Sequence, residues 1–385
     1  MMVQRFKSFT VAVFSLFLLV FGLSAQAQHH DGHDTASHEA GKDTAHKEEL
    51  NIGEVIFEHV LDGHEFHFFG KSVPLPVILY SPKKGFTSFM SSEFHHGHAT
   101  HEGYMILTSH NIKEMGLDPQ KFKAENIYAV GADGKPDPTI KVYDFSLTRN
   151  VVQMILALIV FVWIMLRIAK RYKKGTGVTS APKGSQSLLE PVITFVRDEV
   201  AKPNLGHKYE KYLPYLLTVF FFILINNIFG LIPGSANVTG NIAFTAVLGL
   251  ISFVVIMASS NGHYWGHIFN PPGVPLGVKF ILVPVEFLSV FIKPFALIIR
   301  LFANMVAGHI IIICLISLIF IAGQLNTGAG WGASPFSIGF TVFIYMIEVL
   351  VAFLQAFIFT MLTAVFIGQA FEGEHHDDAH AAAHH

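Results

Sequence analysis

The chain has 385 residues, of which 51% are hydrophobic and only 14% are charged, and its formal net charge is −2. This composition is typical of a polytopic membrane protein and excludes an ordinary soluble domain. The single cysteine, Cys314, excludes an intrachain disulfide, and nothing in the charge balance indicates a nucleic-acid partner.

Residues 1–27 have the pattern of a secretory signal peptide. Arg5 and Lys7 form a basic start, residues 11–23 an apolar core, and Ala25 and Ala27 a small-residue cleavage site. A retained signal anchor is the alternative, but the apolar run is short for a complete span. Cleavage places the mature N-terminus in the periplasm.

An extramembrane region follows. Residues 28–50 are rich in histidine and lack periodicity, so we expect disorder. Residues 51–145 have the composition of a small periplasmic α+β segment. Alternating residues in 65–72 and 74–81 predict short strands, and residues 110–122 predict a short helix that ends at Gly116. No function is evident from this segment.

Two histidine-rich stretches raise the question of a metal site. His95, His96, His98 and His101 lie close together, and residues 373–385 form a second histidine-rich tail, for which we expect disorder. Histidine is a common zinc and copper ligand, but there is no cysteine partner and the spacing fits no zinc motif. We therefore favour a solvated surface and predict no metal site.

The transmembrane region is predicted over residues 146–372. A first span over 151–166 is followed by five Lys and Arg residues between positions 167 and 174, which places the next loop in the cytoplasm. Within that loop, residues 188–200 fit an interfacial amphipathic helix. Further spans are expected at 213–232 and 241–259, and residues 261–277 form a cytoplasmic return rich in Gly, Pro and aromatic residues.

Two longer apolar segments, 278–324 and 336–371, close the chain. Each exceeds the roughly 20 residues that an upright span requires, so tilt or a bend at Pro284 or Pro294 is expected. The fold class is therefore an all-α polytopic membrane protein with about five transmembrane helices and a cytoplasmic C-terminus.

Within the first of these segments, Arg300 requires an explanation. A charged side chain near the middle of a membrane costs about 2.5 to 3.5 kcal/mol on insertion scales. At about 100° per residue, Glu286, Lys293, Arg300 and Asn304 fall within roughly one quadrant of the helix. The same side carries three small residues that would allow another helix to approach closely, namely Ala296, Ala303 and Ala307.

His309 lies about half a turn away from Arg300 in angle and roughly 13 Å further along the helix. Its side chain therefore faces a different compartment from that of Arg300. This spacing predicts two polar routes that are offset from each other across one helix.

These residues resemble a known family. The run from Arg300 to His309, RLFANMVAGH, preceded by Lys293-Pro294, resembles the signature of the a subunit of bacterial F-type ATP synthases. The runs EVLVAFLQAFIF from Glu348 and NIFGLIP from Asn227 resemble that family in the same order and spacing.

The resemblance implies a stator subunit that conducts protons through two offset half-channels to and from the carboxylates of the c-ring. It also implies b subunits of the peripheral stalk and the F1 sector as partners, the inner membrane as location, and a tilted helical hairpin beside the rotor. No cofactor is implied. The subunit is not catalytic alone, and the sequence has no Gly-rich phosphate loop.

The roles of individual residues follow from the same resemblance. Arg300 is a fixed charge, because arginine keeps its proton at any accessible pH. In many bacterial relatives the residue types at His309 and Glu348 are exchanged, so the pair would be retained and its members swapped. The expected outer half-channel consists of His309, Glu348, Asn304, Gln355 and Asn227, and the expected inner half-channel of Glu286 and Lys293.

Two other classes of protein remain as alternatives. A secondary transporter with an intramembrane ion pair would show internal repeats with matched broken helices, and none is visible. A metal-handling membrane protein is favoured only by the histidine-rich tails. The coupling ion is taken as the proton rather than sodium, although the c subunit largely decides this.

Overall fold

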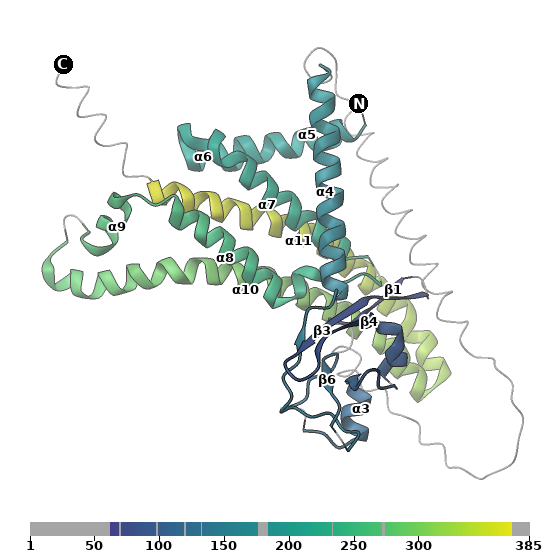
Figure 1. The fold of residues 1–385 in the computed structure, drawn as a ribbon. Coiled ribbons are helices and arrows are strands. Elements are labelled where there is room, and N and C mark those ends of the chain that lie inside the picture. The colour runs from purple at the N-terminus through teal and green to yellow at the C-terminus, as the bar shows by residue number, and fades with distance from the viewer. Residues whose placement is uncertain are drawn as a thin grey trace, which may run out of the picture. The chain divides into compact units, whose positions relative to one another are not determined.

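The computed structural model describes residues 62–68, 71–97, 99–118, 121–131, 133–175, 184–232, 234–271 and 274–371. The predictions for the signal peptide, for residues 28–50 and for the C-terminal tail lie outside these residues. The chain divides into two compact units, the first built on Gly63–Leu147 and the second on Thr148–Leu231 and the residues from Ala236 onward. Helices dominate, as predicted (Figure 1).

The first unit consists of short antiparallel strands. β1 (Glu65–Phe68) pairs with β2 (Lys71–Pro74), and β3 (Pro76–Ser81) lies between β4 (Gly85–Met90) and β7 (Tyr143–Asp144). A third pair is β5 (Tyr104–Ile106) with β6 (Ile127–Ala129). β1, β2 and β3 confirm the strands predicted from alternation, whereas β4 to β7 were not predicted.

Two short helices complete the first unit. η1 (Ser91–Gly97) follows β4, and α3 (Ser109–Glu114) follows β5. The side chain of Thr108 accepts a hydrogen bond from Asn111 N and so caps α3, and Gly116 ends it with a φ of 62°, which a residue without Cβ adopts easily. The predicted short helix is therefore present and ends just before Gly116, as expected.

A hydrogen bond joins the two ends of the first unit. His64 Nε2 lies 3.0 Å from Asp144 Oδ2, and Ser146 N donates to Asp144 Oδ1 at 2.8 Å. Burial raises the pKa of Asp144, but the bonds from His64 and Ser146 outweigh burial and hold that pKa below its ordinary value.

We expect this carboxylate to make the first unit acid-sensitive. Because its folded pKa is lowered, its contribution of about 1 kcal/mol is present above the unfolded pKa and is lost as the pH falls through the folded value, below about pH 4. Hydrogen exchange of the β3 amides in the full chain, compared at each pH with Asp144→Asn, measures this. Equal protection of the two chains at pH 6 would contradict it.

The predicted absence of a metal site concerns the histidines beside η1. Among the described residues, no group of three or more His, Cys, Asp or Glu side chains could hold a metal ion. The His101 ring packs on Phe89 at 4.8 Å and lies 3.8 Å from Glu93. His98 and the side chain of His96 lie outside the described part.

The second unit is helical. Its helices are α4 (Arg149–Lys173), α5 (Ser185–Phe195), the π-helical η2 (Val196–Ala201), α6 (Lys202–Leu205), η3 (Gly206–Lys208), α7 (Tyr209–Gly230), η4 (Val238–Gly240), α8 (Ile242–Ala258), α9 (Gly262–Phe269), α10 (Leu276–Leu325) and α11 (Thr327–Phe371). The predicted amphipathic stretch corresponds to α5 and η2. Gly206, with a φ of 52°, separates that stretch from α7.

Four described helices are long and apolar enough to cross a membrane, and the count rises to five if α8 and α9, bent by 99°, form one span. The predicted return over 261–277 contains a helix that was not predicted, α9. Gly262 and Gly266 argue against a helix by propensity, but tertiary contacts override this. Trp265 Nε1 donates to Ser260 Oγ at 3.1 Å, and Asn261 N to Ala370 O at 3.1 Å.

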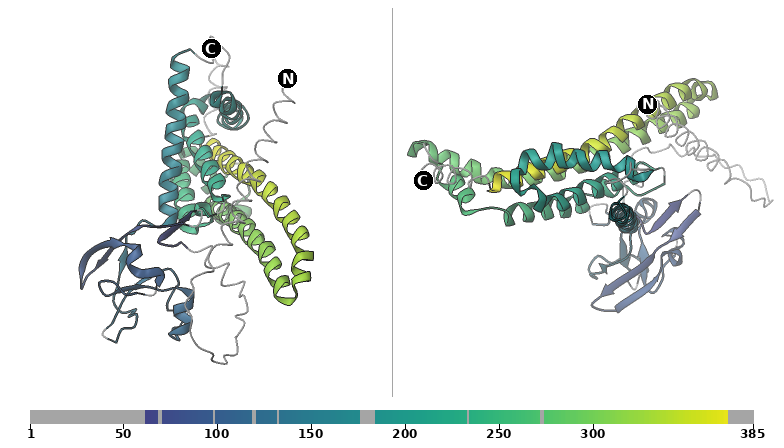
Figure 2. Two further views of the ribbon diagram at one scale, coloured as in Figure 1. Left: turned by 90° about the vertical axis from the view of Figure 1, so that its right-hand side faces the viewer. Right: turned by 90° about the horizontal axis from the view of Figure 1, so that it is seen from above.

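The two longest helices form the predicted hairpin and run side by side (Figures 1 and 2). α10 has 50 residues and continues through Pro284 and Pro294, so its length of about 75 Å requires strong tilt in a bilayer. α11 begins nine residues earlier than predicted. A Cβ at Gly330 would lie 2.9 Å from Gly323 Cα, so two glycines allow the helices to meet at the tip.

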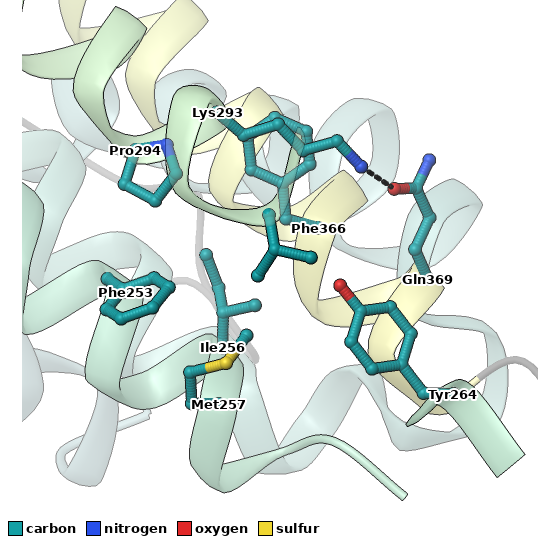
Figure 3. A pocket seen from close by; sticks show the side chains of 9 residues that line it. Phe253, Ile256, Met257, Tyr264, Lys293, Pro294, Phe366 and Gln369 are labelled. Carbon is teal, nitrogen blue, oxygen red and sulfur yellow. Dashed lines mark hydrogen bonds between the residues drawn. The ribbon is translucent and has the colours of Figure 1, made fainter. Parts of the chain in front are cut away.

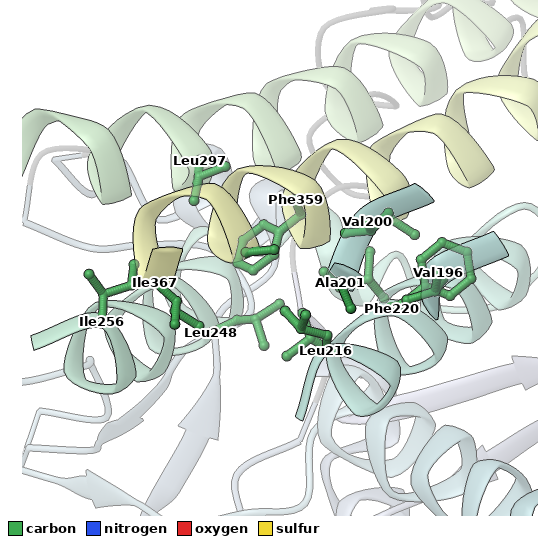
Figure 4. Close-up of a cluster of buried hydrophobic side chains, with 14 of the residues drawn as sticks. Val196, Val200, Ala201, Leu216, Phe220, Leu248, Ile256, Leu297, Phe359 and Ile367 are labelled. Carbon is green, nitrogen blue, oxygen red and sulfur yellow. The ribbon is translucent and has the colours of Figure 1, made fainter. Parts of the chain in front are cut away.

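The core of the second unit lies where the hairpin meets the shorter helices. Figure 4 shows Val196 and Val200 of η2, Phe220 of α7 and Phe359 of α11 packed together. All four side chains are at most 1% exposed. This packing holds α11 against α7 and thereby positions the polar residues of the hairpin.

Candidate functional site

Arg300 lies on an exposed face of α10. It has no hydrogen bond or ion pair with any residue that the structure describes. Ala296, Ala303 and Ala307 are exposed beside it, as predicted from helical spacing. A full positive charge without a partner is costly in an apolar surrounding, so a nearby counter-charge would stabilise Arg300 there.

One turn beyond Arg300, an amide pair joins the two helices of the hairpin. Asn304 Nδ2 donates to Gln355 Oε1 at 3.0 Å. Gln355 is only 2% exposed, whereas Asn304 reaches the exposed face of α10. The pair therefore connects the surface beside Arg300 to the interior between α10 and α11.

Glu348 lies two turns before Gln355 on α11 and is 5% exposed. A Cβ at Gly308 would overlap Glu348 Oε1, so the carboxyl group rests on the backbone of α10. His309, which is half-buried, is the next residue of α10. The structure thus brings the carboxyl group to the turn of α10 that carries this histidine.

Asn227 of α7 is fully buried against the same part of α11. Its Nδ2 donates to Ala352 O at 3.1 Å, and Ala352 lies between Glu348 and Gln355 in the sequence. All five residues predicted for the outer half-channel are therefore found along one stretch of the α7, α10 and α11 packing.

Two further polar residues in this region were missed from the sequence. They are Asn226, beside Asn227 on α7, and Thr341, seven residues before Glu348 on α11. The spacing of 341, 348 and 355 places these residues on one helical face, which is the signal that could have identified Thr341.

Four buried oxygen atoms in this part of the structure have no hydrogen-bond partner among the described residues: Asn226 Oδ1, Asn227 Oδ1, Thr341 Oγ1 and Glu348 Oε2. An unsatisfied buried polar group costs about 1 to 3 kcal/mol. Buried water commonly satisfies such groups, and these positions are suited to binding it.

On the other side of Arg300, Lys293 lines a small pocket between α8, α9, α10 and α11 (Figure 3). Lys293 Nζ donates to Gln369 Oε1 at 3.1 Å and lies 5.2 Å from the centre of the Phe366 ring. Tyr264 of α9 also lines the pocket. Gln369 and Tyr264 were not predicted, because their proximity depends on how α9 and α11 pack.

Glu286 lies on α10, two turns before Lys293, and is exposed. The structure does not place its carboxylate in the pocket lining. It nevertheless lies close enough to Tyr264, which lines the pocket together with Lys293, to interact with it electrostatically.

Lys293 and His309 lie before and after Arg300 along the axis of α10. Lys293 precedes it by seven residues and His309 follows it by nine, which corresponds to about 10 Å and about 13 Å along the helix axis. Polar residues of α10 thus lie both before and after Arg300, and the apolar residues Leu297, Leu301 and Met305 are buried.

Comparison with known proteins covers both units. A family model described as ATP synthase A chain matches residues 151–368, and one described as a domain of unknown function matches residues 55–145. The chain is 47% identical to an ATP synthase subunit a from Chloroherpeton thalassium over 254 residues, which are 64% of this chain and 74% of the relative. Another from Anaeromyxobacter sp. is 34% identical over 359 residues, 90% of this chain and 77% of the relative.

Proposed function

Because this chain belongs to the ATP synthase A chain family, we propose that it conducts protons through two half-channels that meet the rotor ring at Arg300. As an ATP synthase subunit a, the chain is a proton-translocating component of the Fo sector and is not catalytic alone. It is a multi-pass protein of the bacterial inner membrane.

The observation that carries the proposal is the exposed charge of Arg300 among small residues, with no partner in the described part of the chain. The alanines allow a rotor helix to approach closely, and a carboxylate on that helix would supply the missing counter-charge. Beside a fixed arginine, an Asp or Glu favours its ionised form and releases its proton. The same charge hinders a proton from passing directly between the two half-channels.

The outer half-channel runs along α11 toward Arg300. Thr341, Glu348 and Gln355 share one face, and Asn304 completes the series on α10. The unsatisfied oxygens at Thr341, Glu348 and the two asparagines favour a file of water there. His309 and Glu348 would pass protons along this file, because histidine titrates near neutral pH.

The inner half-channel starts at the Lys293 pocket. Gln369 and Tyr264 supply its polar lining, and Glu286 would attract protons at the cytoplasmic mouth.

The basic residues that end α4 favour a cytoplasmic location for the following loop, and hence a periplasmic first unit and a cytoplasmic C-terminus. The c-ring and the b subunits of the peripheral stalk are the partners that membership of this family implies.

Cysteine cross-linking tests the rotor-facing side directly. In a Cys314→Ser background, we expect Ala303→Cys to cross-link to the c subunit in the assembled complex. Val162→Cys on α4 is the matched control, because Val162 is also exposed and α4 packs mainly on α7. Cross-linking at 162 but not at 303 would place the rotor on another face and refute the proposal.

A further inference from the structure

The first unit has an apolar sheet face that its own core does not cover. β3 contributes Val77 and Leu79 to the buried side of the sheet, and both are fully buried. The opposite side carries Tyr80, Phe86, Met90, Tyr143 and Phe145, which we call the aromatic face. Its side chains are between 38% and 73% exposed.

The aromatic face is continuous across three strands. Tyr80 of β3 is paired with Phe86 of β4 and with Tyr143 of β7, and the ring centroids are 5.2 and 6.2 Å from Tyr80. Phe145 follows Tyr143 by two residues and therefore lies on the same side of the extended chain. Five large apolar side chains on one side of a small extramembrane unit are more than scattered surface residues.

Chain connectivity places this face near the membrane. Phe145 is four residues before Arg149, where the first transmembrane helix begins, so it lies within about 14 Å of that helix end. Within the second unit, Asp62 Oδ1 accepts a hydrogen bond from Asn150 N at 3.1 Å, and Asp62 directly precedes Gly63, where the first unit begins. The chain therefore enters and leaves the first unit next to residues of the first turn of α4.

We propose that the aromatic face docks on the lipid bilayer at the periplasmic interface. Tyr and Phe rings are suited to this zone, where an apolar body meets lipid and a polar tip meets water. The two connections at α4 keep the face at a high local concentration beside the bilayer, so weak affinity is sufficient. The docked unit would hold α4 against rotation at its periplasmic end.

Lipid-specific quenching tests the proposal in the intact complex. In a Cys314→Ser background, Phe86→Cys and Glu114→Cys are labelled with a polarity-sensitive fluorophore and reconstituted into phosphatidylcholine–phosphatidylglycerol vesicles. Glu114 on α3 is a matched control, because it is about as exposed as Phe86: the exposed fractions are 71% for the Glu114 side chain and 73% for Phe86. We expect headgroup-linked spin labels to quench position 86 several-fold more than position 114.

Equal lipid quenching at the two positions would overturn the proposal. A label at 86 that is shielded from aqueous iodide but insensitive to the spin-labelled lipid would also overturn it, since another protein segment would then cover the face. Tyr143→Cys repeats the measurement at the strand nearest α4 and guards against a local effect of one substitution. Proton pumping is measured separately, so failure here leaves the half-channel proposal intact.

Discussion

Replacement of Arg300 by alanine is expected to abolish ATP-driven proton pumping while the complex remains assembled. Without the fixed charge, a rotor carboxylate in an apolar surrounding retains its proton. An opposite charge nearby shifts a carboxyl pKa by about 1 to 3 units, so its loss lowers the ratio of ionised to protonated carboxyl about 10- to 1,000-fold. Pumping in inverted vesicles, with a pH-sensitive dye, measures the effect.

Two controls separate this role from a general effect on folding. Arg167→Ala removes an arginine from α4, where it stacks on Trp163 at 5.1 Å, and we expect it to leave pumping nearly unchanged. Co-purification of the c-ring with the Arg300→Ala chain verifies assembly. Unimpaired pumping by Arg300→Ala at equal assembly would contradict the central role of this charge.

Replacement of Glu348 by glutamine should lower proton flux through the complex by about 10²-fold or more, the usual contribution of a positioned proton-transfer group. Glutamine has nearly the same shape, so the contact with the backbone at Gly308 is retained, but it neither takes up nor releases a proton. Passive proton flux through Fo in vesicles stripped of the F1 sector measures the loss.

The exchange of His309 and Glu348 provides a sharper form of this test. If the pair acts as a relay, His309→Glu combined with Glu348→His should recover much of the flux that either single substitution removes. Glu190→Gln is the matched control, because Glu190 Oε2 on α5 is also buried without a described partner but lies outside the polar series. Similar losses for Glu190→Gln and Glu348→Gln would indicate a structural role for both.

The strands of the first unit and the helices of the second follow from residue pattern. Alternation in residues 76–81 places Val77 and Leu79 inward, and long apolar runs indicate spans because a backbone in lipid must satisfy its own hydrogen bonds. The periodicity of an α-helix also places Arg300 beside Ala296, Ala303 and Ala307, and this placement does not depend on any other helix. These features depend on neighbours within one or two turns.

Features that join distant segments were decided only by the tertiary structure. The Asn304–Gln355 and Lys293–Gln369 bonds join residues 51 and 76 positions apart, and no local pattern encodes which amide meets which. Likewise α9, whose glycines argue against a helix, is supported by the bond from Asn261 to Ala370. Local periodicity determines which face of a helix is polar, whereas close packing of α7, α10 and α11 determines what that face meets.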